Sequence, residues 1–168
     1  MIQMLEPMWS EFREEAVTTR RVLERVPADK LSWKPHPKSM SLGQLALHVA
    51  GIPGNLAKLA QVDELDASQA SFEPSAPSDL NAVYATLDQS IRSAEECLNG
   101  MSQEAALASW RLTVRGKELF SKPRIGLLRS IMLNHWYHHR GQLSVYLRLL
   151  DIPVPVIYGR SADENPFA

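Results

Sequence analysis

Apolar residues recur along much of the chain at alternating steps of three and four, which is the spacing of one face of an α-helix. Charged residues fall between the members of each apolar stripe, as on the solvent-facing side of a helix. The first stripe runs through Ile2, Leu5, Trp9, Phe12 and Ala16. Together the stripes predict four helices and an irregular tail, at about residues 2–26, 41–62, 79–100, 122–150 and 151–168.

Local signals indicate where these helices begin and bend. Ser41 followed by Gln44 is the pattern of a capping box, in which the two side chains satisfy free backbone N–H groups reciprocally. Pro53 has no N–H group, so we expect a kink or a short break inside the second helix. Pro123 is expected in the first turn of the fourth helix, where proline is tolerated. At residues 107–120 the periodicity loosens, and the pattern allows either a short hairpin or an irregular covering loop.

Four amphipathic helices of about 20 residues predict an all-α protein, a four-helix bundle. The length of 168 residues suits one domain that covers residues 1–168. The connections are too long for loop length to fix the order in which the helices pack. The fourth helix carries a second apolar stripe on an adjacent face, so either it lies centrally or one of its faces meets a partner subunit.

Composition and charge exclude several classes of protein. The chain has 18 Lys and Arg against 19 Asp and Glu, and no basic block that would indicate binding to nucleic acid or to an anionic membrane. Cys97 is the single cysteine, which excludes an intramolecular disulfide, and we expect it to be a small core residue. The start of the chain has no signal-peptide pattern, and no stretch approaches the roughly 18 uninterrupted apolar residues of a spanning helix. We therefore expect a cytoplasmic protein.

Three of the five histidines lie in one segment of the fourth helix, residues 134–142. His135 and His139 are separated by four positions, so both imidazoles project from the same helix face about one turn apart. They fall on the inward-facing stripe, where an imidazole is unfavourable unless its ring nitrogens have partners. A divalent metal ion would satisfy them, and His48 on the second helix is the best candidate for a third ligand. Ordinary hydrogen bonds to all three rings are the alternative.

Three neutral imidazoles leave open positions around an ion, which is typical of catalytic sites, because structural zinc sites fill all four places with Cys or His. Zinc or nickel suits such a set best, and iron, cobalt or manganese can also bind it. An ion with an open position can activate either water or a thiol as a nucleophile. His36, between two prolines, and His138, on another helix face, are expected to be structural or exposed, with a role toward substrate left open for His138.

Three segments and part of the tail carry a likeness to known proteins: VPADKLSWKPHP at 26–37, SLGQLALH at 41–48, NHWYHHRGQL at 134–143 and VIYG at 156–159. In order and spacing they resemble the DinB-like four-helix proteins, a family that includes bacterial low-molecular-weight-thiol S-transferases. The middle of the chain, 60–120, carries little of the resemblance.

This resemblance implies a down-up-up-down bundle with a long crossover between helices two and three, and commonly a homodimer. It also implies a divalent metal ion on His48, His135 and His139. The family is functionally mixed, however, and a shared fold does not settle the chemistry.

The leading hypothesis is a metal-dependent transferase, in which the ion activates a small cellular thiol for attack on an electrophilic small molecule. Arg140 and Gln142 are weaker candidates for catalytic residues, since Gln142 shares the inward stripe and Arg140 can equally serve only in a salt bridge. One alternative is a metal-dependent hydrolase, which would need no added thiol for turnover. The other is a non-catalytic dimer that binds a metal ion or a small ligand.

Overall fold

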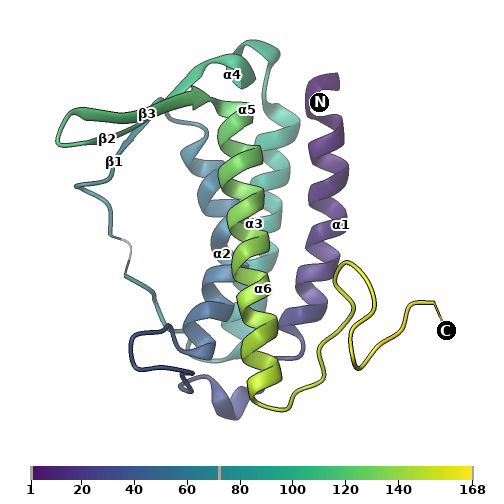
Figure 1. Cartoon of the computed structure of the whole chain (residues 1–168). Helices are drawn as coiled ribbons and strands as arrows, with labels where there is room; N and C mark the ends of the chain where they lie inside the picture. Colours follow the sequence, from purple (N-terminus) through teal and green to yellow (C-terminus); the bar gives the residue numbers. More distant parts are fainter. Residues whose placement is uncertain (1, 72, 168) are drawn as a thin grey trace.

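The structure is a computed structural model that describes residues 2–71 and 73–167. Four long helices lie side by side (Figure 1). Their bounds are Glu6–Leu23 for α1, Leu42–Leu59 for α2, Leu80–Gly100 for α3 and Asn134–Leu149 for α6. The shorter helical elements are 3-10 turns at Gln3–Leu5 and Ala28–Lys30, α4 at Gln103–Leu107, α5 at Arg124–Leu127 and a π-helical segment at Leu128–Leu133 that joins α5 to α6.

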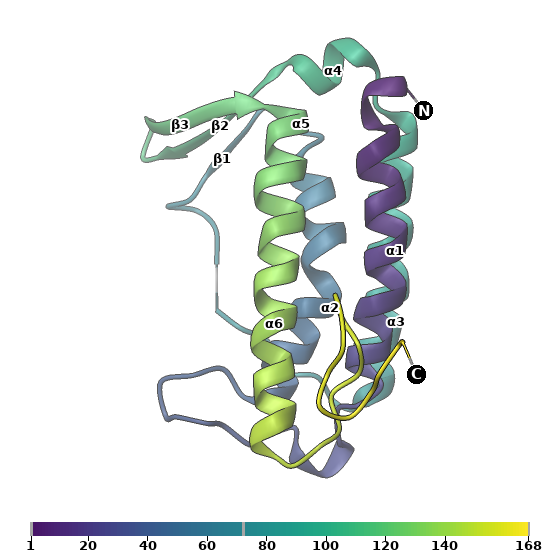
Figure 2. The ribbon, with the colours of Figure 1, turned by 45° about the vertical axis from the view of Figure 1, so that its right-hand side comes forward.

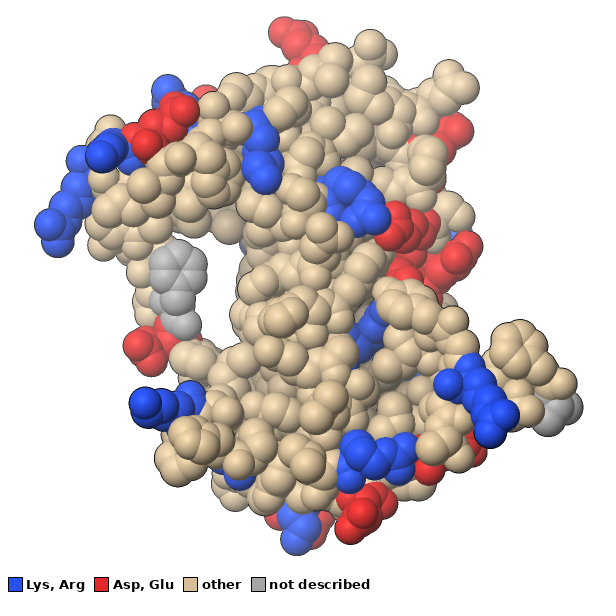
Figure 3. Space-filling view, viewed as in Figure 1, with Lys and Arg blue, Asp and Glu red and all other residues tan. Residues whose placement is uncertain are grey.

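The long helices run in two directions, as Figure 1 and Figure 2 show. α1 and α6 run away from the end that carries the N-terminus, whereas α2 and α3 run toward it. Because α2 and α3 run the same way, the connection at residues 60–79 crosses the length of the helices. In the space-filling view acidic and basic side chains are interspersed over the visible face (Figure 3).

A small three-stranded sheet lies at one end of the helices and extends to one side, so the all-α prediction is wrong in this respect (Figure 1). β1, Glu64–Asp66, pairs in parallel with β2, Ser109–Val114, and β2 pairs antiparallel with β3, Lys117–Pro123. The register places Leu65 opposite Leu112 and Leu112 opposite Phe120.

The two-residue turn between β2 and β3 has φ of 51° at Arg115 and 76° at Gly116, which is the backbone twist that a tight hairpin requires. The carboxylate of Asp66 accepts a hydrogen bond from the Arg115 N–H at 3.1 Å and so ties β1 to this turn. Of the two alternatives for 107–120, the hairpin is therefore correct.

The helix boundaries follow the local signals in part. The capping box is confirmed, because the Ser41 Oγ accepts from the Gln44 N–H at 3.1 Å and the Gln44 Oε1 accepts from the Ser41 N–H at 2.9 Å. The fourth helix begins later than predicted, at Arg124, since Pro123 is paired in β3 opposite Ser109 and directly precedes the helix.

The expected break at Pro53 does not form, because α2 is continuous through it. Proline leaves the carbonyl four residues earlier, that of Val49, without its usual helical donor. The indole Nε1–H of Trp136 donates to this carbonyl at 3.0 Å. The next residue, Gly54, lies so close to α3 that an added Cβ would be 2.7 Å from the Cα of Ser90, and its N–H donates to the Ser90 Oγ at 2.7 Å. Neighbouring helices thus support the segment that the proline weakens.

The core explains the second apolar stripe on the fourth helix. Four of its five residues, Leu133, Trp136, Leu143 and Leu147, are fully buried within the chain, and Leu150 at its end is half-buried. The indole of Trp136 stacks on Phe12 of α1 with ring centroids 5.5 Å apart. This stripe therefore faces the core and needs no partner subunit to cover it.

Candidate metal centre

The three histidines singled out in the sequence lie together in the structure. His48 comes from α2, and His135 and His139 come from α6. One ring nitrogen from each lies within 4.8 Å of those of the other two, and all three side chains are half-buried. The ring centroid of His48 lies 5.3 Å from that of His135 and 4.6 Å from that of His139, and the centroids of His135 and His139 are 4.4 Å apart. The three imidazoles therefore form one cluster between two helices.

Secondary structure and helix packing each supply part of this arrangement. The i, i+4 spacing on α6 places His135 and His139 on one face. His48 reaches them because α2 packs directly against α6, where the Trp136 indole bonds to the Val49 carbonyl. Val49 follows His48 in the chain and Trp136 follows His135, so this bond holds α2 against α6 at the level of the imidazoles.

The spacing of the nitrogens fits a metal ion. The Nε2 atoms of His48 and His135 are 3.2 Å apart. Two imidazole nitrogens bound to one zinc ion at about 2.0–2.1 Å with tetrahedral angles would be about 3.3 Å apart. The observed separation is close to this value, so the two rings can share an ion with little movement.

The protonation states also suit metal binding. Burial lowers the pKa of His48 to about 4, with further lowering by the nearby His139 and His135. Burial lowers the pKa of His135, and it lowers that of His139 despite the opposing effect of a hydrogen bond to Gln142. The imidazoles are therefore neutral near pH 7, the form in which histidine coordinates metals.

Gln142 contacts the cluster through His139. Its Oε1 lies 2.7 Å from the His139 Nδ1. A carboxamide oxygen only accepts, so the proton of the neutral imidazole is on Nδ1 and the Nε2 lone pair is free. A hydrogen bond of this kind commonly orients the histidine ligands of metal sites. The candidate Gln142 thus lies beside the cluster and holds one of its rings.

Arg140 lies outside the cluster, on a different face of α6, and is almost fully buried. Its guanidinium forms an ion pair with Glu15 and donates to the Thr19 Oγ1 of α1 at 3.1 Å. It also donates to the Tyr158 hydroxyl of the tail at 2.6 Å. These contacts link α6, α1 and the tail, as expected for the salt-bridge alternative.

The remaining histidines and the cysteine have separate positions. His36 is exposed in its loop, where its Nδ1 accepts from the Lys38 N–H. His138 is exposed too, but its ring centroid is 4.9 Å from that of His139, so it lies at the edge of the cluster. Cys97 is buried, as predicted, and its thiol donates to the Ala57 carbonyl.

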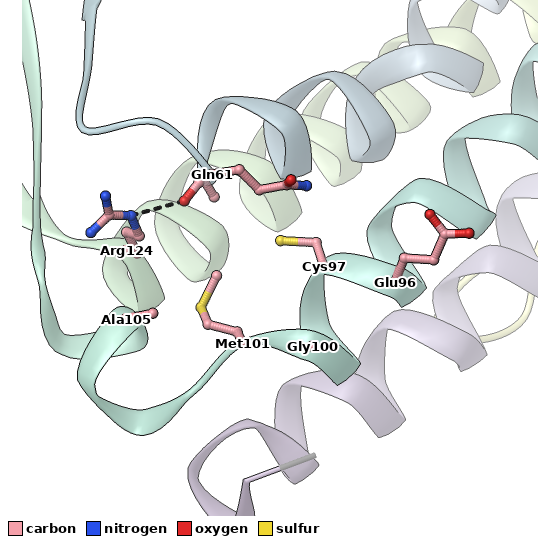
Figure 4. A pocket seen from close by; sticks show the side chains of 8 residues that line it. Gln61, Glu96, Cys97, Gly100, Met101, Ala105 and Arg124 are labelled. Atoms are coloured by element: carbon pink, nitrogen blue, oxygen red, sulfur yellow. Dashed lines mark hydrogen bonds between the residues drawn. The ribbon is translucent and has the colours of Figure 1, made fainter.

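A cavity of about 460 Å³ lies near the ends of α2 and α3, and Cys97, Met101 and Arg124 are among the residues that line it (Figure 4). The Arg124 Nε–H donates to the Ala60 carbonyl at 2.9 Å, so this side chain caps the end of α2. None of the three histidines lines this cavity.

Sequence reasoning missed the contact between Trp136 and Val49. The available signal was Pro53, whose missing N–H leaves the Val49 carbonyl free in a helix. The sequence pattern predicts only a kink or short break at Pro53. It does not show that an indole far along the chain can donate to the carbonyl that the proline leaves free.

No helix among the described residues combines the length and apolar character needed to cross a membrane.

Comparison with known proteins gives consistent likenesses. The chain is 23% identical over 164 residues to YrdA of Bacillus subtilis (strain 168), an uncharacterized protein, covering 98% of this chain and 93% of that one.

Two solved structures share the fold. A DinB-like protein from Bacillus cereus ATCC 10987 matches with a TM-score of 0.69 and 19% identity, over 92% of this chain and 97% of that one. The DinB-like protein YjoA from Bacillus subtilis matches with a TM-score of 0.64 and 22% identity, over 90% of this chain and 97% of that one. The DinB family model itself matches residues 1–165, which includes all three clustered histidines, and on this match the protein belongs to the DinB family.

Proposed function

We propose that this protein holds a divalent metal ion on His48, His135 and His139 and is a metal-dependent transferase. Its substrates would be a low-molecular-weight thiol and an electrophilic small molecule. The observation that carries the proposal is the convergence of three half-buried imidazoles from two helices. When bound, the ion would supply the Lewis acidity that favours the thiolate over the thiol near pH 7.

The residues of the chain would prepare and orient this site. Burial keeps the pKa of His48 near 4, so the ring offers a lone pair without first losing a proton. Gln142 would hold the proton of His139 on Nδ1, which leaves Nε2 as the nitrogen that can bind an ion. His138, exposed beside His139, is placed to contact a bound substrate. Arg140 would act by holding α6 against α1 rather than by touching the reactants.

Zinc or nickel is our first choice of ion, and iron, cobalt or manganese would also accept three imidazoles. We further infer that residues 1–168 form one domain of the down-up-up-down bundle type, with the sheet as an addition at one end. We infer a cytoplasmic homodimer, and the half-exposed Val145 and Leu149, one turn apart on α6, support a contact between copies.

The first experiment is elemental analysis of untagged protein purified without chelator, with a His48→Ala variant prepared in parallel. We expect nearly one metal ion per chain in the natural protein and a large loss in the variant. Equal metal content in both, or none in either after reconstitution, would contradict the proposed site.

Turnover then separates the competing chemistries. The loaded protein is given electrophilic substrates with and without added thiol. A transferase requires the thiol, whereas the alternative hydrolase turns over without it. Stoichiometric metal with no turnover in either condition would favour the non-catalytic binding protein.

A further inference from the structure

The bond between Trp136 and Val49 replaces a missing helical hydrogen bond. In a regular helix the Val49 carbonyl would accept from the N–H of residue 53, which here is proline. The Trp136 Nε1–H takes that place at 3.0 Å, and both side chains are fully buried. Without the indole, this carbonyl would lack a donor in the core, which is unfavourable.

The position of this bond relates it to the histidine cluster. Val49 follows His48 on α2, and Trp136 follows His135 on α6. The bond therefore joins the two helices one residue away from each of the two imidazoles whose Nε2 atoms are 3.2 Å apart. Metal–nitrogen bonds tolerate only small errors in length, about 0.2 Å. The separation of α2 and α6 at this level thus decides whether three nitrogens can reach one ion.

We propose that Trp136 is a positioning residue for the three-histidine site, and that Pro53 gives it this role by leaving the Val49 carbonyl open to an interhelical donor. The inference rests on the proposed metal site. Stacking of the indole on Phe12, with centroids 5.5 Å apart, holds the ring in its place from α1. The imidazoles are then held close together before an ion arrives, which reduces the ordering that binding would otherwise require.

The chain contains a matched control for this contact. The Nε1–H of Trp110 also donates to a carbonyl of α2, that of Leu59, at 2.9 Å, and Trp110 is buried as well. This second bond lies at the end of α2, where β2 covers it. Replacing either tryptophan by phenylalanine removes the same N–H donor, but only Trp136 adjoins the cluster.

The test measures the binding of Co²⁺, by its visible absorption and by competition with a chelator, together with the melting temperature of the metal-free protein. We expect Trp136→Phe to raise the Kd for Co²⁺ about tenfold or more and to change the absorption bands of the bound ion. Trp110→Phe should lower the melting temperature by less, because the Leu59 carbonyl also accepts from the Val62 N–H at 3.4 Å, and it should leave both the Kd and the bands unchanged.

A double variant separates stability from positioning. In Trp136→Phe combined with Pro53→Ala, the new N–H of residue 53 can satisfy the Val49 carbonyl inside α2. The double variant should therefore recover melting temperature relative to Trp136→Phe alone. Its Kd for Co²⁺ should stay raised, because the link between α2 and α6 is still missing. If Trp136→Phe alone does not fold, the Kd for Co²⁺ without the indole is measured on the double variant.

The outcomes are distinguishable. A Kd and spectrum like those of the natural protein in the folded Trp136 variants would overturn this inference and leave the proposed function intact. Recovery of the Kd together with melting temperature in the double variant would overturn it as well, because Trp136 would then act through stability alone. Failure of the natural protein itself to bind any of zinc, nickel, cobalt, iron or manganese would refute the proposed function and, with it, this role of Trp136.

Discussion

The Nε2 atoms of His48 and His135 lie 3.2 Å apart, although the two residues are separated by 87 positions in the chain. His139 completes the group from the next turn of α6. Nitrogen atoms this close either share a proton in a hydrogen bond or bind one ion, because two lone pairs that faced each other would repel. The cluster is thus a preformed set of donors, and its effect on metal affinity and stability can be measured residue by residue.

Gln142→Ala should raise the Kd for zinc about tenfold, because the His139 ring loses the acceptor that fixes its Nδ1 proton. Gln142→Glu should retain tight binding, since a carboxylate accepts the same hydrogen bond. Competition with a chromophoric chelator measures both. Gln142 is exposed, so the melting temperature of the metal-free protein should be unchanged in either variant. An unchanged Kd in Gln142→Ala would show that His139 needs no such support.

The metal-free protein should lose stability as the pH falls from about 6.5. Burial holds the pKa of His48 near 4 in the folded state, below its ordinary value of 6.5. Between these values the unfolded chain binds more protons than the folded one, so the free energy of unfolding rises with pH and the stabilisation is complete above about pH 6.5. The pKa values of His135 and His139 are also lowered, so these two residues likewise make the free energy of unfolding rise with pH.

Melting temperatures measured from pH 7 to pH 5 test this dependence. The pKa values of Asp66, Asp163 and Glu164 are lowered from ordinary values of 3.8 to 4.5, so these carboxyl groups change the stability mainly below this pH window. His48→Gln should flatten the profile, because glutamine does not titrate. A profile with the same slope in the variant would show that other groups cause it.

Arg140→Leu should lower the free energy of unfolding by about 3–5 kcal/mol, because it leaves the Glu15 carboxylate without its partner in a largely buried position. Replacing both Arg140 and Glu15 by leucine should lower the free energy of unfolding by less than Arg140→Leu alone. Urea unfolding of the three proteins measures this coupling. Zinc affinity should be unaffected in any variant that folds, since no cluster histidine is a hydrogen-bond or ion-pair partner of Arg140 among the described residues. A stable Arg140→Leu protein with lost turnover would instead indicate a catalytic role.

Gly54→Ala should destabilise the protein by about 1–3 kcal/mol, because the new methyl group would lie 2.7 Å from the Cα of Ser90 and push α2 from α3. Gly141→Ala on α6 is the matched control. Apart from its chain neighbours and the backbone of its own helix, a Cβ there meets no described atom within 4 Å, so the better helix propensity of alanine should raise stability by up to about 1 kcal/mol. Thermal unfolding of both variants tests the pair, and equal effects would contradict this account of the α2–α3 contact.

Local sequence patterns determined the elements that depend on neighbours within a few positions. The apolar stripes predicted the four long helices, because burial of one face follows the period of the helix itself. The capping box of Ser41 and Gln44 and the shared face of His135 and His139 were also predictable, since both arise within one or two turns. His48 was named as a third ligand beside His135 and His139 from its place next to the stripe of the second helix, and Gln142 from its place on the inward stripe. The contact of Gln142 with His139 was not predicted.

Only the tertiary structure decided the features that depend on distant segments. Residues 107–120 form a hairpin because β1, from the crossover, pairs with β2. Arg140 is placed against Glu15 by the packing of α6 on α1. Pro53 stays inside a continuous α2 because Trp136, far along the chain, supplies the donor that proline lacks. The sequence by itself therefore determined which side chains each helix presents, because that follows from backbone periodicity. The packing of the helices decided which of those side chains meet, because a contact between segments depends on the burial and hydrogen bonding of the whole chain at once.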